Sequence, residues 1–147
     1  MNEIENGLLR GNRKSAAPFT RVPFDSPADS RRAAMLSCDP RIHFALNCGA
    51  VSCPPIAVYS GDDLDRQLDD ATKGFLEDNT TVNAEDNSIS LSMLFKWYKE
   101  DFGETDEGII QWIRDQAPEK LSKAIKTLTT TPTLKYPSYN WDLNNKS

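Results

Sequence analysis

The chain has 147 residues, of which 38% are hydrophobic and 27% are charged, and its net charge is −5. This length and composition are typical of one globular domain, so we expect a single domain over residues 1–147. No apolar run approaches the roughly 18 residues that suggest a membrane span. Lys and Arg form no continuous footprint for nucleic acid, and the short basic cluster over residues 10–21 fits a solvated loop. We therefore expect neither a membrane span nor a nucleic-acid partner.

The first residues and the cysteines bear on the cellular compartment. The opening residues MNEIENGLLRGN lack the basic segment followed by an apolar stretch that a secretory signal requires. The three cysteines, Cys38, Cys48 and Cys53, are an odd number in a chain too large to depend on disulfides, which favours reduced thiols. Both observations predict a cytoplasmic protein.

The first forty residues predict short helices joined by a loop. Residues 2–10 predict a helix whose apolar side, around Ile4, needs a surface to pack on. Residues 11–30 carry three prolines and scattered serines, which indicates a surface loop. A second short helix is expected to have Pro27 in its first turn and Ser26 as its cap, and to run through residues 31–36.

The middle of the chain predicts a strand, a helix and a hairpin. Residues 41–47 alternate in the way that favours a short strand, and a turn over residues 49–55 follows. Apolar residues recur at intervals of three and four over residues 62–78, which predicts an amphipathic helix capped by Ser60. Alternation over residues 80–91 predicts a hairpin.

The last third predicts three helices and an extended segment. The elements expected in chain order are a helix over residues 91–102 that ends at Gly103, a helix capped by Thr105, a helix begun by Pro118, and an extended segment over residues 133–143 that adds a terminal strand. Together the elements predict an α+β fold with a small sheet and several packed amphipathic helices.

The run RIHFALNCGAVSCPP, residues 41–55, holds the chain's only histidine and two of its cysteines. Imidazole and thiol are the side chains that titrate or act as nucleophiles nearest neutral pH, so we expect any chemical site here. A strand would point His43 to one face and Cys48 to the opposite, apolar face, and the turn at Gly49 would bring Cys53 back over the imidazole. Cys53 is therefore the favoured nucleophile, with Cys48 as a buried filler or the alternative thiol.

Catalysis by a thiol needs further groups beside the thiol and the base. The side chain that orients the His43 ring is expected to be Asn47 or Asn140. Pro54 and Pro55 have no amide hydrogen, so the two residues after the favoured thiol cannot donate to an oxyanion. This weakens the case for an enzyme.

Three other interpretations of the run remain open. The first is packing, because cysteine is among the most buried residue types and a histidine often satisfies backbone groups. The second is a thiol switch or disulfide between Cys48 and Cys53. The third is metal binding by His43 with the two thiols, but the familiar paired zinc spacings are missing. We expect no metal and no cofactor.

Three stretches occur together: NEIENGLLR near the start, DPRIHFALNCGAVSCPP in the middle, and ISLSMLFKWYKEDFG followed by YNWDLN near the end. With these stretches the chain resembles the domain of unknown function 547 family, and its eukaryotic members most. Those members often carry the domain behind a coiled coil or behind glutaredoxin-like and DEP domains, which implies a regulatory setting. The family's resemblance to papain-like and transglutaminase-like cysteine enzymes implies a truncated form of that fold.

The resemblance also implies that the domain is N-terminally incomplete, because family members usually begin upstream with a helix reading roughly FWINLYNA. An apolar surface left by that segment implies self-association. Asn140 stands where many relatives have Asp. We expect a noncatalytic interaction or regulatory module with a protein partner. The alternative is a papain-like cysteine hydrolase or acyltransferase that uses Cys53 and His43.

Overall fold

The computed structural model describes residues 2–17, 19–128 and 131–144. Helices dominate, and the strands form one small mixed sheet, so the fold is α+β as predicted. The chain divides into two compact units, residues 1–40 and residues 41–147. The expectation of a single domain stays a prediction. No helix among the described residues is long and apolar enough to cross a membrane.

The first unit contains a helix with wide turns, η1 (Glu3–Leu9), and a 3₁₀ helix, η2 (Ser30–Ala34). The predicted helix at the start is confirmed, but Ile4 is exposed, and η1 buries Asn6 and Gly7 instead. Gly7 is needed because a Cβ there would lie 2.5 Å from the Phe24 ring.

The prediction of Ser26 as the cap of the second helix is wrong. The carboxylate of Asp29 caps η2 by accepting a hydrogen bond from the Arg31 amide, so the helix begins later than expected. An aspartate at this position satisfies a backbone N–H that the first helical turn leaves unpaired.

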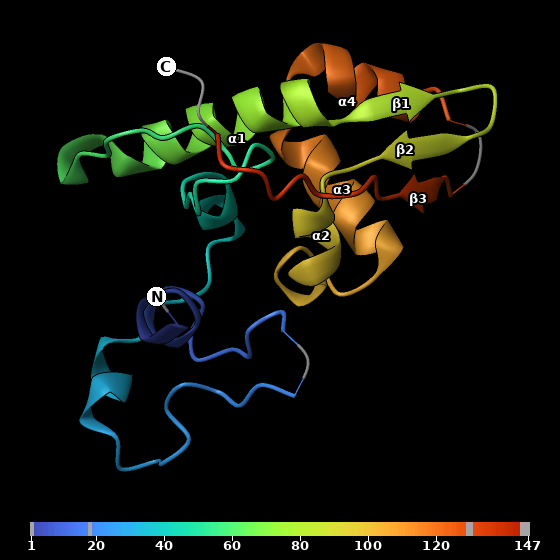
Figure 1. The fold of residues 1–147 in the computed structure, drawn as a ribbon. Helices are drawn as coiled ribbons and strands as arrows, with labels where there is room; N and C mark the ends of the chain where they lie inside the picture. Colours follow the sequence, from blue (N-terminus) through green and yellow to red (C-terminus); the bar gives the residue numbers. More distant parts are fainter. Residues whose placement is uncertain (1, 18, 129–130, 145–147) are drawn as a thin grey trace. The chain divides into compact units, whose positions relative to one another are not determined.

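The second unit carries the main helices and the sheet. Its elements in chain order are α1 (Leu64–Asn79), β1 (Thr81–Asn83), β2 (Ser88–Ser90), α2 (Met93–Trp97), α3 (Asp106–Gln116), α4 (Glu119–Lys126) and β3 (Thr133–Lys135). Figure 1 labels all of them. The helices predicted over residues 62–78, after Thr105 and after Pro118 are therefore confirmed.

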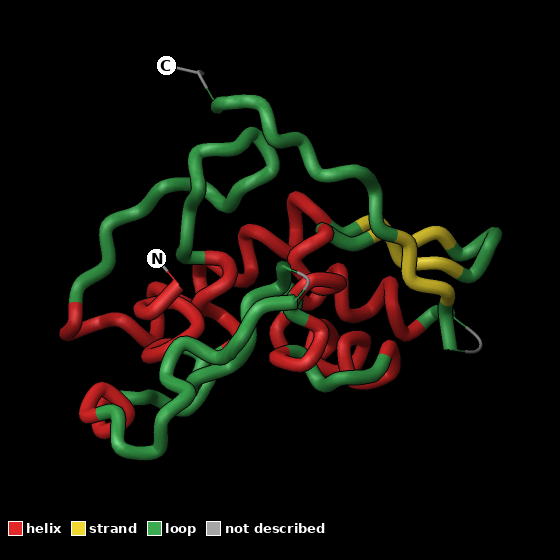
Figure 2. Tube along the Cα trace, turned by 60° about the horizontal axis from the view of Figure 1, so that its bottom comes forward, coloured by secondary structure: helices red, strands yellow, loops and turns green. Residues whose placement is uncertain are grey.

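The sheet has the order β1-β2-β3, and Figure 2 shows its three strands side by side in yellow. β1 and β2 form the predicted antiparallel hairpin, and β3 pairs parallel to β2 with Leu134 beside Ile89. Ile89 is completely buried in this central strand. The predicted terminal strand is confirmed over residues 133–135, and the chain beyond it runs as a loop along the same unit.

An aromatic cluster forms the centre of the core in the second unit. The Phe44 ring lies 4.8 Å from Phe75 of α1, 5.8 Å from Phe95 of α2 and 5.9 Å from Trp112 of α3. Such tilted ring pairs add to the free energy gained by burying the rings. Phe44 thus ties the run of residues 41–55 to three helices.

The strand predicted over residues 41–47 is wrong, because the chain forms a 3₁₀ helix, η3 (Pro40–Phe44). Pro40 fixes a φ angle suited to a first helical turn. The amides of residues 45 and 46 both donate to the Ile42 carbonyl. His43 and Phe44 are adjacent and both are buried, which a strand with alternating faces would not allow when one face meets solvent.

Two further predictions need correction. The helix expected over residues 91–102 is divided into α2 and a 3₁₀ turn, η5 (Lys99–Asp101). Ser60 precedes the predicted helix, but its side chain makes no capping hydrogen bond. By contrast, the predicted cap at Thr105 is confirmed, because its hydroxyl accepts a hydrogen bond from the Gly108 amide at 3.0 Å.

Candidate functional site

His43 lies in the core and pairs with a carboxylate. Its Nε2 is 2.8 Å from Oδ2 of Asp101, and the two side chains are 1% and 0% exposed. The ring also stacks on Tyr98, with centroids 4.0 Å apart and planes inclined by 25°. Charged or polar groups at this depth are stable only with such partners. Asp101 therefore holds the orientation of the imidazole.

The turn after α2 positions Asp101. Tyr98 is the C-cap of α2 and Asp101 is the last residue of η5, so the ring and the carboxylate that contact His43 come from one short stretch of chain. Phe102 follows at once, and its ring lies 5.4 Å from that of His43. Two aromatic residues of the segment predicted as a helix over residues 91–102, Tyr98 and Phe102, thus lie beside the histidine.

Cys53 lies in a hydrogen-bonded turn. The Cys48 amide donates to Cys53 Sγ at 3.1 Å, and the Tyr139 hydroxyl donates to the same sulfur at 3.3 Å. The Cys53 amide in turn donates to the Ala50 carbonyl at 3.0 Å. The sulfur therefore accepts hydrogen bonds from Cys48 and Tyr139, and such bonds favour its negatively charged form.

The donors change the acidity of both partners. Partial burial acts to raise the pKa of the Cys53 thiol, but hydrogen bonds from Cys48, Tyr139 and the backbone outweigh it, so this pKa lies below its ordinary value. Burial, and next the hydrogen bond to Cys53, raise the pKa of the Tyr139 hydroxyl. The hydroxyl therefore stays protonated at neutral pH and remains a donor to the sulfur.

Two distant stretches of sequence meet at this thiol. Ala50 forms an antiparallel bridge with Leu143, and backbone hydrogen bonds join Val51 to Asp142 and Ser52 to Asn140. The stretch CGAVSC therefore runs beside the stretch YNWDLN. In addition, the Trp97 ring of α2 lies 4.9 Å from the ring of Tyr139 and 5.5 Å from that of Trp141.

Each asparagine expected to orient His43 has other hydrogen bonds. Asn47 closes the turn, because its amide group donates to the Pro54 carbonyl and its Oδ1 accepts from the Gly49 amide. Asn140 Oδ1 accepts from the Asp142 amide. Both side chains thus support the local backbone of the two paired stretches.

The interpretation of Cys48 as a buried filler is wrong, because this residue is exposed. The segment before Cys48 forms the 3₁₀ helix η3 and not a strand. The alternation of faces that was expected to point Cys48 into the core is therefore absent from this segment. Within the described residues, the hydrogen bonds to the Cys53 sulfur come from Cys48 and Tyr139, and His43 is not one of the donors.

Sequence reasoning missed Asp101, Tyr98 and Tyr139 as members of these clusters. One signal was available for Asp101, since a carboxylate directly before Phe102 in an aromatic, core-facing segment requires a buried partner. Tyr139 gave no comparable signal, because its contact with Cys53 joins residues 86 positions apart.

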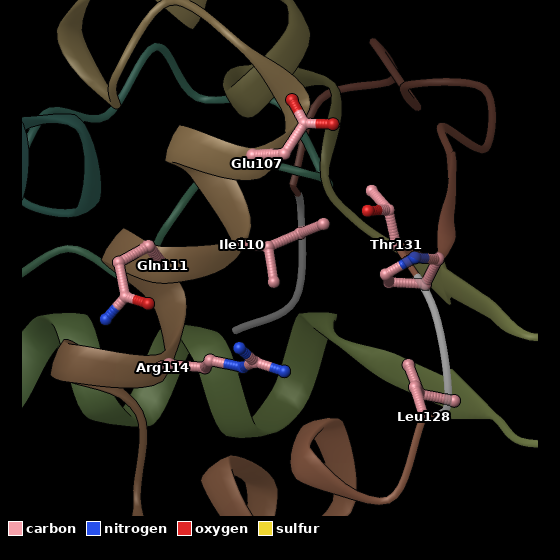
Figure 3. Close-up of a pocket in the computed structure, with 7 residues that line it drawn as sticks. Glu107, Ile110, Gln111, Arg114, Leu128 and Thr131 are labelled. Carbon is pink, nitrogen blue, oxygen red and sulfur yellow. The ribbon is translucent and has the colours of Figure 1, made fainter.

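A separate cavity lies beside α3 and contains none of the residues predicted for the site. Its lining is drawn in Figure 3 and consists of Glu107, Ile110, Gln111, Arg114, Leu128, Thr131 and Pro132. No group of His, Cys, Asp and Glu side chains that could hold a metal ion occurs in the described part of the chain.

The chain is similar to a known family of proteins. The family model described as "Protein of unknown function, DUF547" matches residues 1–76, which is more than half of the 147 residues. This stretch contains His43, Cys48 and Cys53, whereas Asp101 and Tyr139 follow it. No curated protein and no solved structure matches the chain.

Proposed function

We propose that this chain, which belongs to the DUF547 family of proteins of unknown function, is a noncatalytic interaction or regulatory module with a protein partner. The observation that carries the proposal is the state of the single histidine. The His43 ring is buried, paired with Asp101 and stacked on Tyr98. An imidazole held in this way acts as part of the core, and a thiol enzyme would need it as a base in contact with the nucleophile.

Exposed apolar residues near Cys53 support a partner surface. Val51, Trp141 and Leu143 are 42%, 65% and 72% exposed, and all three lie on the paired stretches of residues 49–53 and 139–144. Exposed apolar groups that gather in one region are typical of contact surfaces. The partner would present apolar side chains, and a cytoplasmic setting fits because the three cysteines are free thiols.

A second function is favoured by one specific observation. Asp101 orients His43 as the third member of a catalytic triad does, and the pKa of Cys53 is lowered. These features suit a papain-like cysteine hydrolase or acyltransferase that uses Cys53 and His43, with a papain-like fold. Such an enzyme needs the imidazole and the sulfur to meet.

The two functions differ in what controls the acidity of Cys53. The test is the rate of iodoacetamide labelling of Cys53 against pH, in the wild type and in the variants His43→Gln and Tyr139→Phe. For a noncatalytic module, His43→Gln leaves the midpoint of labelling unchanged, and Tyr139→Phe moves it to higher pH because the sulfur loses a donor. Circular dichroism checks that each variant is folded.

The opposite result would contradict the proposal. If His43→Gln raises the midpoint while Tyr139→Phe does not, the imidazole controls the thiol and the enzyme is favoured. The partner surface is tested with Trp141→Ser, against Val58→Ser as a control at an apolar residue that is 94% exposed and lies outside the paired stretches. Partner capture that Trp141→Ser leaves intact would reject this surface.

A further inference from the structure

The two thiols of the turn lie close together. The Cys53 sulfur accepts a hydrogen bond from the backbone amide of Cys48 at 3.1 Å, and the amide nitrogen and Cβ of one residue are only two bonds apart. The Cys48 side chain also acts as a hydrogen-bond partner that lowers the pKa of Cys53. The Cys48 side chain is exposed, so its sulfur is free to rotate about χ1 into the position from which it attacks Cys53.

The turn is held in this shape independently of the sulfurs. Asn47 bridges it, since its side chain donates to the Pro54 carbonyl at 2.5 Å and accepts from the Gly49 amide at 2.6 Å. Gly49 has φ of +86°, which glycine adopts without strain. The loop between the two cysteines is therefore preformed, and closing it costs less conformational entropy than in a flexible chain.

We propose that Cys53 is an oxidation site for hydroperoxides and that Cys48 is the resolving cysteine that converts the oxidised Cys53 into a disulfide. The proposal rests on the geometry of the turn and holds whether or not a protein partner binds. The exposed Cys48 and the half-buried Cys53 are both within reach of a small peroxide.

The chemistry balances in two steps. The Cys53 thiolate attacks one oxygen of hydrogen peroxide, the O–O bond breaks, and Cys53 becomes a sulfenic acid while hydroxide leaves and takes up a proton as water. The Cys48 thiolate then attacks the sulfenic sulfur, the S–O bond breaks, and a second hydroxide leaves as water. Two thiols are oxidised by two electrons, and one peroxide is reduced to two waters.

The surroundings of Cys53 suit the first step. A lowered pKa increases the thiolate fraction at neutral pH, and the thiolate is the reacting form. The protonated Tyr139 hydroxyl stays beside the sulfur as a donor, so it is also near the oxygen that leaves. Tyr139 is a positioning residue in this step.

Oxidation also changes the contact with the C-terminal stretch. A disulfide sulfur carries no charge and accepts hydrogen bonds more weakly than a thiolate. The hydrogen bond from Tyr139 therefore weakens, and the Tyr139 ring packs against Trp97 and Trp141. Tryptophan fluorescence consequently reports the oxidation.

The test is hydrogen peroxide treatment of the folded chain, followed by alkylation of remaining thiols, digestion and mass spectrometry. We expect a Cys48–Cys53 disulfide that loses about 2 Da, forms at a rate independent of protein concentration, and reverts with dithiothreitol. Cys38→Ser is the matched control and should form the same disulfide. In Cys48→Ser, Cys53 should instead be trapped by dimedone as a sulfenic acid.

The Tyr139→Phe variant tests whether the hydrogen bond from Tyr139 speeds the reaction of Cys53 with peroxide, beyond the closeness of the two thiols. We expect this variant to react with peroxide about three- to fivefold more slowly at pH 7, while at pH 10 its rate approaches that of the wild type. The proposal is overturned if both cysteines remain alkylatable after peroxide treatment, or if the disulfide that forms includes Cys38. Failure here leaves the iodoacetamide test of the proposed function unaffected.

Discussion

Gly108, in the first turn of α3, should not tolerate even one methyl group. A Cβ on Gly108 would lie 2.4 Å from the Gly103 carbonyl oxygen and 2.9 Å from its carbonyl carbon. Both contacts are with backbone, which cannot rotate away as a side chain does. Gly103 itself has φ of +115°, so the turn that follows Asp101 and Phe102 is already restricted to glycine. Gly108→Ala therefore presses on the turn that holds the partner of His43.

The magnitude follows from two opposing terms. Forcing a methyl group into a filled space costs about 1–3 kcal/mol, and a rigid backbone neighbour puts Gly108 at the upper end. Replacing glycine with alanine inside a helix gains about 1 kcal/mol. We expect Gly108→Ala to lower the free energy of unfolding by about 2 kcal/mol.

Gly74 of α1 provides the matched control, because a Cβ there would meet no atom within 4 Å. Gly74→Ala should raise the free energy of unfolding by up to about 1 kcal/mol, so the two variants should differ by about 3 kcal/mol. Urea unfolding followed by circular dichroism measures both. If Gly108→Ala stabilises the protein as much as Gly74→Ala does, the close approach of Gly108 to Gly103 is refuted.

Three other variants test the capping, the buried pair and the thiol. Thr105→Ala should lower the free energy of unfolding by about 1 kcal/mol, because α3 loses its N-terminal cap, and an unchanged urea midpoint would contradict this. Asp101→Asn should lower the free energy of unfolding by about 2 kcal/mol in the wild type and by less in the His43→Gln variant. A double-mutant cycle of urea unfolding measures this difference, and equal costs in the two backgrounds would mean that the two side chains do not interact. The pKa of Cys53 is lower in the folded state than in the unfolded state, where it is about 8.5. Ionisation of this thiol therefore stabilises the fold fully above the unfolded-state pKa, and this stabilisation is lost as the pH falls through the folded-state pKa. Between pH 7 and pH 9 the free energy of unfolding of the wild type should therefore rise relative to that of Cys53→Ser, and parallel curves would contradict the lowered pKa.

The elements predicted correctly from sequence are those whose signals are local. The helix α1 repeats its apolar residues every three or four positions, and the hydroxyl of Thr105 bonds to an amide three residues away. The hairpin of β1 and β2 likewise joins neighbours in sequence. In each case the residues that determine the element lie within it.

The strand over residues 41–47 failed because distant residues decide that segment. His43 is buried by Asp101, which lies 58 positions away, and Phe44 is buried by Phe75. The alternation of seven residues does not reveal that two adjacent side chains, His43 and Phe44, are both buried against distant partners. Pro40 was the local sign of a helical turn.

The sequence located the candidate thiol and its turn, whereas the catalytic roles of His43, Cys53, Asn47 and Asn140 stay predictions. Cys53 was singled out as the favoured thiol, and the turn at Gly49 was expected, but the turn brings the sulfur to Cys48 and Tyr139. The expectation that Cys53 lies over the His43 ring assumed that the ring is on the open face of a strand, but the ring is buried in the core. Which distant side chain completes a cluster depends on the packing of the whole unit, and a single sequence does not contain that information in readable form.

Nuclear magnetic resonance of the His43 ring tests most directly whether the imidazole acts independently of the thiol. His43 is the only histidine, so its ring nitrogens are assigned without ambiguity in a ¹⁵N-labelled chain. Cys53 is blocked with methyl methanethiosulfonate in the Cys38→Ser, Cys48→Ser background, and the ring ¹⁵N shifts are followed with pH before and after blocking. We expect the two sets of shifts to coincide, because the ring is fixed by Asp101 and Tyr98. A changed titration of the ring after blocking would demonstrate an imidazole–thiolate pair and contradict a noncatalytic module.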